Sequence, residues 1–204
     1  MIECINVTKR YRERDVIKNL SFSILDGEFV CFSGKSGSGK TTLLNLIGLL
    51  EEPTSGKILF DGVEITSRRD RLDFYRNRVG FVFQNFALLD NKTVKENLTL
   101  VKRRHRQEGV TMEDALKKVG LIDKLNNKIY TLSGGEQQRV ALARLYFKQC
   151  SLILADEPTG SLDKENATEV LKILRQLNSQ KRTVILVTHD SEIERQCDRI
   201  IELR

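Results

Sequence analysis

The glycine-rich stretch from Gly34 to Thr41, GKSGSGKT, constrains the fold of this 204-residue chain more than any other feature. It follows the apolar run Phe29–Phe32 and precedes apolar residues at positions 43, 44, 46 and 47, which recur at helical spacing. We therefore predict a strand, a glycine-rich loop and a helix in that order. A chance glycine- and serine-rich turn would rarely combine this spacing with both flanking elements, so the pattern indicates a phosphate-binding loop.

The residue types of this loop suit an anion. Its glycines let backbone N–H groups close around phosphate oxygens, and the helix that follows points its positive end at the same anion. Lys40 would reach the β- and γ-phosphates, and the hydroxyl of Thr41 would bind Mg²⁺, so we predict a magnesium nucleoside triphosphate. The predicted nucleotide-binding residues of this phosphate loop are Gly34, Lys35, Ser36, Gly37, Ser38, Gly39, Lys40, Thr41 and Thr42.

The composition allows one substantial core, alone or with a small satellite lobe. The longest nearly apolar run, Leu43–Leu50, is too short to cross a bilayer. The N-terminus shows no basic segment followed by an apolar stretch and a cleavage site, so we expect a cytoplasmic location. The four cysteines form no C-x-x-C pair, and Cys31 falls in the expected strand, where a small buried residue is the ordinary explanation.

The net charge of +6 would suit nucleic acid or an anionic membrane surface, and the densest basic run is Lys102–Arg106. That run follows a helical pattern, precedes Gly109 and lacks interleaved aromatic residues. We therefore interpret it as a solvated helix end and predict no nucleic-acid partner.

The N-terminal third predicts a small antiparallel lobe. Residues 2–7 and 20–24 read as strands joined by a polar turn over residues 8–19, and a second strand pair, 57–60 and 63–65, turns at residues 61–62. Within the polar stretch, Tyr11 lies where a ring could stack on a nucleotide base, with Val16 as an apolar neighbour. Taken alone, Tyr11 would more often be half-buried packing.

Polar side chains follow three apolar runs that read as strands buried on both faces. Gln84 follows residues 79–83, Asp156 and Glu157 follow residues 152–155, and His189 comes after residues 183–187. Ligands bind at the carboxyl ends of strands in open α/β sheets. Asp156 would hold Mg²⁺, Gln84 would touch the ion or its water, and Glu157 would polarise the attacking water. A lone histidine there is usually structural, but this convergence favours a hydrogen bond from His189 to the γ-phosphate.

Residues 85–131 predict a helical insertion, with helices over 93–102 and 112–119. It ends in LSGGEQQR, residues 132–139, where Ser133 and Glu136 have the spacing of a capping box. Gly134 and Gly135 remove side chains from this helix N-terminus, so its backbone amides and the Ser133 hydroxyl are free to bind an oxyanion.

From Tyr11 to His189, these motifs resemble those of the ATP-binding cassette (ABC) family, and LSGGEQQ is the most specific of them. The resemblance implies that Tyr11 stacks on adenine and that Gln84 couples the site to a partner. It implies that Ser133, Gly134 and Gly135 bind the γ-phosphate of a neighbouring subunit's ATP. The remaining implied roles are Asp156 as metal-shell acid, Glu157 as general base, Asp163 as a contact across the dimer, and His189 as γ-phosphate switch.

The resemblance also implies a fold and an activity. The expected fold is an α/β P-loop NTPase cassette with a core mixed sheet, an antiparallel β lobe and an α-helical subdomain of approximately residues 85–150, all within one ATP-binding domain of residues 1–204. The expected activity is ATP hydrolysis with Mg²⁺ by an ATP-dependent homodimer. Such a protein would lie at the inner face of the cell membrane, bound to an integral membrane permease.

Residues 81–90 and 155–163 resemble the exporter branch that serves macrolides, lipoproteins, antimicrobial peptides and bacteriocins. Gln84 and residues 85–90 are predicted to form the docking surface for the permease, because the apolar Phe86, Leu88 and Leu89 follow a strand end in an otherwise polar loop. An alternative is a cassette that drives signalling or a cell-division hydrolase without transport, and the ATPase sequence does not separate the two. A nucleic-acid repair or translation cassette would need a long coiled-coil insertion or a second cassette, and the sequence has neither.

Overall fold

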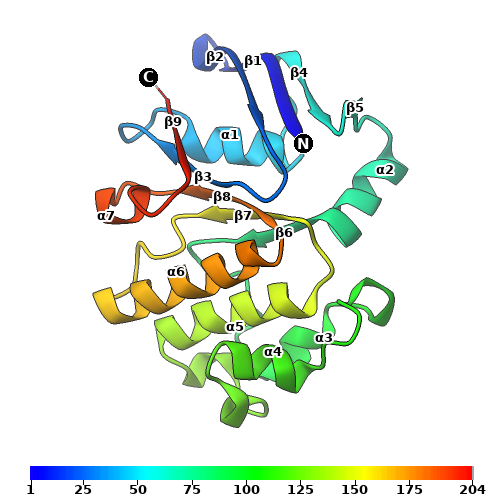
Figure 1. Ribbon diagram of the computed structural model, residues 1–204, viewed down its shortest axis with the longest axis vertical. Helices are drawn as coiled ribbons and strands as arrows, with labels where there is room; N and C mark the ends of the chain where they lie inside the picture. The colour runs from blue at the N-terminus through cyan, green and yellow to red at the C-terminus, as the bar shows by residue number, and fades with distance from the viewer. Residues whose placement is uncertain (204) are drawn as a thin grey trace.

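The computed structural model describes residues 1–203, whose strands form two sheets with helix α1 (Lys40–Ile47) between them (Figure 1). The first sheet is antiparallel and has the strand order β2-β1-β4-β5. Its strands are β1 (Ile2–Tyr11), β2 (Arg14–Ile24), β4 (Ser55–Phe60) and β5 (Val63–Glu64). This is the antiparallel lobe that the sequence predicts.

The turn between β1 and β2 is much shorter than predicted. Both strands continue through the polar stretch, and Tyr11 pairs with Arg14 across a tight turn. An antiparallel sheet needs an apolar surface on one face only, so exposed polar side chains such as Arg10 and Lys18 fit on the solvent face. The interpretation of residues 8–19 as a turn was wrong for that reason.

The second sheet is the core of the molecule, with the strand order β6-β7-β8-β3-β9. Its strands are β3 (Phe29–Ser33), β6 (Val79–Val82), β7 (Leu152–Asp156), β8 (Thr183–Val187) and β9 (Arg199–Glu202). Every described pairing in this sheet is parallel, so the core sheet is not the mixed sheet that was expected, and the antiparallel strands lie only in the separate first sheet. Parallel pairing brings the carboxyl ends of these strands to one edge.

Helices cover both faces of the core sheet (Figure 1). Val30 and Phe32 pack toward α1 and the antiparallel sheet, whereas Phe29 packs toward α5 (Gly134–Phe147) and α6 (Lys164–Ser179) on the other face. Below these lie α3 (Val94–Thr99) and α4 (Met112–Lys118) (Figure 1). The helical insertion is therefore a layer built on α5, one step removed from the sheet.

The basic run does not end a helix as predicted. Helix α3 stops at Thr99, and Arg103–His105 form a separate 3₁₀ turn. Lys102, Arg103 and Arg104 are exposed, but the Arg106 guanidinium lies 4.7 Å from the centre of the Phe147 ring. The run is thus solvated only in part, because Arg106 covers an aromatic side chain of α5.

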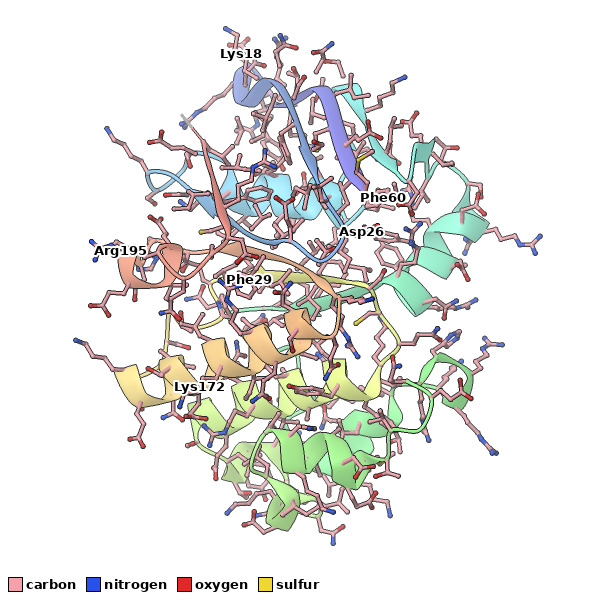
Figure 2. The ribbon with its side chains drawn as sticks, viewed as in Figure 1. Lys18, Asp26, Phe29, Phe60, Lys172 and Arg195 are labelled. Carbon is pink, nitrogen blue, oxygen red and sulfur yellow. The ribbon has the colours of Figure 1, made fainter. Side chains whose placement is uncertain are left out.

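Several elements lie outside the sequence-based expectations. Helix α2 (Arg68–Asp73) continues into a π-helical turn, Phe74–Arg78, that leads into β6, and α7 (Ser191–Glu194) precedes β9. Phe74 is 1% exposed, and its ring centre lies 4.8 Å from that of Phe60, which Figure 2 labels. This aromatic pair joins the antiparallel sheet to the start of β6.

The described residues contain no helix long and apolar enough to span a bilayer. All four cysteines are free thiols, and Cys31 is fully buried, which confirms the expectation for that residue.

We expect Phe74→Ala to lower the free energy of unfolding by about 3–5 kcal/mol, because it removes a buried ring from the joint between the sheets. Leu72→Ala is the matched control, since Leu72 belongs to the same segment but is 41% exposed. Urea denaturation of the parent and both variants measures the difference. Equal transition midpoints for Phe74→Ala and Leu72→Ala would contradict the joint described above.

Candidate active site

The phosphate loop has the strand, loop and helix context that the sequence predicts. It connects β3 to α1, and Gly34, Gly37 and Gly39 adopt positive φ angles of 146°, 78° and 93°. A Cβ atom on Gly39 would lie 2.9 Å from Cγ1 of Val16 and 2.7 Å from Ile17. Glycine is therefore required at Gly39 both for its conformation and for the close approach of β2.

The loop has polar groups aimed at its own interior. The Lys40 ammonium, on a residue only 8% exposed, donates to the carbonyls of Gly34 at 2.7 Å and Lys35 at 3.1 Å. The hydroxyl of Ser38 is buried and has no hydrogen-bond partner among the described residues. A buried donor without an acceptor is costly, and a phosphate oxygen is an acceptor that fits between these groups.

Tyr11 lies near this loop at the end of β1 and is 43% exposed. Its hydroxyl donates a hydrogen bond to the carboxylate of Glu51. Glu51 also accepts from Asn45 Nδ2 at 3.1 Å and pairs with Lys9 Nζ at 3.1 Å. Burial and then the bond to Glu51 raise the pKa of Tyr11. The ring is thus fixed at its hydroxyl end and remains accessible, which suits stacking on a base.

Asp156 ends β7 beside the phosphate loop. The hydroxyl of Thr41 donates to Asp156 Oδ1 at 3.1 Å. Burial and then the neighbouring charge of Glu157 raise the pKa of Asp156. A divalent cation next to these oxygens would reverse that effect, because it favours the ionised carboxylate.

Glu157 and His189 form a second polar pair at the same edge. The backbone N–H of Glu157 donates to the carbonyl of Val187 at 3.0 Å, so the ends of β7 and β8 adjoin. His189 Nδ1 lies 2.9 Å from Glu157 Oε1, and this contact raises the pKa of His189. Oxygen Oε2 of Glu157 is buried and has no partner among residues 1–203. A carboxylate with one free oxygen can accept a proton from water.

Gln84 is exposed beyond β6 and lines an open cleft of about 660 Å³. Asp156 and Gly134 line the same cleft, so the structure brings the glutamine amide to the metal-shell candidate and to the start of α5. Phe86 lies 3.9 Å from the Cβ position of Gly134, and Leu88 packs on the core, whereas Leu89 is 48% exposed. The predicted cluster of three exposed apolar residues at 86–89 is therefore wrong.

Ser133 caps α5 in the predicted capping box. Its hydroxyl accepts from the N–H of Glu136 at 3.2 Å, and the Glu136 carboxylate accepts from the N–H of Ser133 at 2.8 Å. The two glycines that follow differ. A Cβ on Gly134 would meet nothing closer than 3.9 Å, whereas a Cβ on Gly135 would lie 2.2 Å from the Asn166 side chain. Gly135 is needed for the packing of α5 on α6, and Gly134 leaves open space at the helix end.

Asp163 is the N-cap of α6 and is exposed. Hydrogen bonds within the described part of the chain link neither Asp163 nor Ser133 to the phosphate loop. The described hydrogen bonds therefore leave Ser133 and Asp163, at the N-termini of α5 and α6, separate from the phosphate loop, although Gly134 and Asp156 line the same open cleft.

Sequence reasoning missed three supporting residues. Gln138 is fully buried and donates to the carbonyl of Pro158 at 2.6 Å, Glu51 holds Tyr11, and Asn166 contacts the start of α5. Gln138 carries a usable signal, because it precedes the apolar stretch of residues 140–143 by less than one helical turn, and a polar side chain buried there needs a partner. Glu51 and Asn166 give none, since their partners are distant in the sequence or depend on helix packing.

Comparison with known proteins gives matches over most or all of the chain. Residues 17–160 match the profile of the family described as ABC transporter. The macrolide export ATP-binding/permease protein MacB of Campylobacter jejuni is 42% identical over 210 residues, covering 100% of this chain and 33% of that protein. The uncharacterized ABC transporter ATP-binding protein YvrO of Bacillus subtilis is 39% identical, covering 100% of this chain and 93% of that protein. The chain thus spans about a third of MacB.

Two solved structures share the fold. The dimeric structure of MJ0796, a bacterial ABC transporter cassette, matches with a TM-score of 0.88 and 38% identity, covering 100% of this chain and 94% of that chain. A dimeric post-hydrolysis state of MJ0796 bound to ADP and Pi matches with a TM-score of 0.85 and 36% identity over the same shares.

The two glycines at the start of α5 should respond differently to the same substitution by alanine. Gly135→Ala should lower the unfolding temperature by several degrees, because the new methyl group overlaps Asn166 and forces α5 and α6 apart. Gly134→Ala is the control and should unfold within about 2 °C of the parent, since its Cβ enters open space. Thermal unfolding followed by circular dichroism measures both. Equal losses for the two variants would contradict the assigned packing.

The chain has two histidines, so its imidazole resonances can be followed separately. We expect the pKa of His189 to lie above its ordinary value because Glu157 stabilises the imidazolium, and that of His105 to lie below it because of burial and nearby cations. Glu157→Gln should lower the pKa of His189 and leave that of His105 unchanged. NMR titration of the parent and of Glu157→Gln tests this, and an unchanged His189 pKa in the variant would contradict the pairing.

Proposed function

The chain belongs to the ABC transporter family, and we propose that it is the ATP-binding and ATP-hydrolysing subunit that powers export through a separate membrane permease. The observation that carries this proposal is the convergence of the phosphate loop, the Thr41–Asp156 pair and the Glu157–His189 pair on one edge of the core sheet. These groups have the chemistry to bind a triphosphate, hold its cation and accept a proton from water.

The reaction is hydrolysis of ATP to ADP and phosphate. Tyr11 stacks on the adenine, with Val16 beside it, and the phosphate loop binds the triphosphate through its backbone amides and Lys40. The Glu157 carboxylate accepts a proton from the attacking water. His189 donates a hydrogen bond to the γ-phosphate, where charge spreads in the transition state.

Mg²⁺ fits the oxygen donors at this edge. No group of three His, Cys, Asp or Glu side chains suited to a metal occurs in residues 1–203, which is consistent with an ion held by few protein ligands and by the phosphates. The ligands from the chain are the Thr41 hydroxyl and Asp156, and Gln84 supplies an amide oxygen from the shared cleft. When bound, the ion neutralises negative charge on the β- and γ-phosphates.

The second anion-binding group serves another copy of the chain. Ser133 and Gly134 form a helix N-terminus that is exposed and has no hydrogen bond to the phosphate loop within the described residues, and Asp163 lies exposed nearby. A two-fold dimer would place each such end against the other chain's ATP, giving two composite sites. The dimeric MJ0796 structures support this arrangement.

We assign residues 1–204 to a single ATP-binding domain, with residues 85–150 as the helical subdomain.

The permease would dock on this subdomain. A groove of 370 Å³ between β6 and the end of α5 is lined by both apolar and basic side chains. Its lining includes Phe81, Phe83, Leu100, Arg76, Lys102, His105, Arg144 and Lys148. This groove replaces residues 86–89 as the proposed docking surface, and it would hold the protein at the inner face of the membrane.

The cargo belongs to the same proposal. The name of the MacB relatives supports export of a drug, and the wider exporter branch that the motifs resemble adds peptides, bacteriocins and lipoproteins.

A mixing experiment tests the composite site. Lys40→Ala and Ser133→Arg should each abolish ATPase activity, because every site of either homodimer carries a lesion. In the mixed dimer, one site collects both lesions and the other has none. Random mixing should therefore restore roughly a quarter of parental activity, since about half of the dimers are mixed and one of their two sites is intact.

Mixed-dimer formation is verified separately with two affinity tags, and ATP hydrolysis is measured as phosphate release. If Ser133 served the ATP of its own chain, each variant chain would keep its own lesion. Activity of the mixture would then stay at the level of the single variants, and the composite site would be rejected.

A further inference from the structure

We propose that Asn166 is a positioning residue that fastens the Asp163 carboxylate to the N-terminal turn of α5, so that both meet the partner's nucleotide as one rigid unit. The proposal rests on the composite site argued above. Asn166 lies on the first turn of α6, and α5 and α6 run side by side below the core sheet (Figure 1).

Asn166 holds both oxygens of one carboxylate. Its backbone N–H donates to Asp163 Oδ1 at 2.9 Å, and its side-chain Nδ2 donates to Asp163 Oδ2 at 2.7 Å. These two bonds lower the pKa of Asp163 and leave its side chain a single orientation. An exposed aspartate at a helix N-cap would ordinarily have only the backbone bond, so the second one is specific to the amide at this position.

The same amide also holds α5. Asn166 Oδ1 accepts from Arg139 Nη1 at 2.6 Å. The Cβ position of Gly135 lies 2.2 Å from this oxygen, so the two helices are as close here as a glycine allows. Asn166 therefore touches α5 at its first turn and again one turn later, and it uses donor and acceptor atoms on different partners.

The exposed and buried residues around Asn166 are arranged in two layers. Ser133, Gly134 and Asp163 are exposed, whereas Gly135 is buried and Asn166 is half-buried behind them. Ser133, Gly134 and Asp163 are thus accessible to a partner, whereas Asn166, which joins them, is less exposed. Ordering loose side chains during association costs free energy, so a prefixed Asp163 and α5 end would favour closure of the dimer.

Two substitutions test the link. Asn166→Asp is nearly isosteric and still accepts from Arg139, but it loses the donor to Asp163 and sets two carboxylates side by side. Asn166→Ala removes both side-chain bonds. Thr168→Ala is the matched control, because it removes one hydrogen bond, to the carbonyl of Lys164, from the same helix end but on an exposed residue.

We expect kcat for ATP to fall about 10-fold in both Asn166 variants and to stay within about twofold of the parent in Thr168→Ala. Binding of a fluorescent ATP analogue to the dilute monomer should be unchanged, since Asn166 does not contact the phosphate loop of its own chain. With Glu157→Gln added to block hydrolysis, ATP should dimerise the parent and the Thr168 variant more strongly than either Asn166 variant. Sedimentation velocity measures the dimer.

A double-mutant cycle separates positioning from simple stability. If Asn166 acts through Asp163, Asn166→Asp should lower kcat little further once Asp163 is alanine. Independent, multiplicative losses would overturn the proposal, as would parental kcat and ATP-driven dimerisation in both Asn166 variants at a temperature where circular dichroism shows them folded. A lack of ATP-driven dimerisation in the Glu157→Gln parent would instead reject the composite site itself, and the role of Asn166 with it.

Discussion

Parallel pairing of β3, β7 and β8 is the constraint on which the candidate site depends. The register sets Phe32 and Asp156 on either side of Val187, so the phosphate loop, the acidic strand end and the segment before His189 start from adjacent positions. No side-chain interaction has to bring them together, because the backbone ladder does so. The sheet fixes the backbone positions, and the Thr41–Asp156 and Glu157–His189 contacts then orient the side chains.

Part of the backbone strain of the described residues lies at the same edge. Glu157 has a φ of 45°, which costs a non-glycine residue about 1–3 kcal/mol, and its Oε2 and the Ser38 hydroxyl are buried without partners among the described residues. The buried strands and the helices on both faces of the sheet compensate for this cost. Backbone strain and unpaired polar groups lower the stability of the fold. They are expected at positions that bind a ligand or take part in a reaction, and these positions include the predicted catalytic residues.

How far the sequence predicts this structure depends on whether a signal is local. The phosphate loop, the buried strands and the Ser133 capping box are encoded in short patterns, and all of them were predicted. The long β1–β2 hairpin was missed because a solvent-facing strand tolerates polar residues, and the π-helical turn at Phe74 was missed because its stability comes from Phe60 in another sheet. Asn166 could not be found either, since its function depends on how closely α5 approaches α6.

Helix α5 connects the two surfaces that the proposed function needs. Its N-terminus is the anion-binding end at Ser133, and Arg144 and Leu145, about 17 Å further along the helix axis, line the groove. Gln138 ties the middle of this helix to Pro158, next to Glu157, and Asn166 ties its first turn to Asp163. A packed helix transmits displacement along its axis with little bending. If the permease docks at the groove as proposed, a shift imposed there would be carried to the nucleotide-facing end of α5, together with Asp163, through the α5–α6 contact.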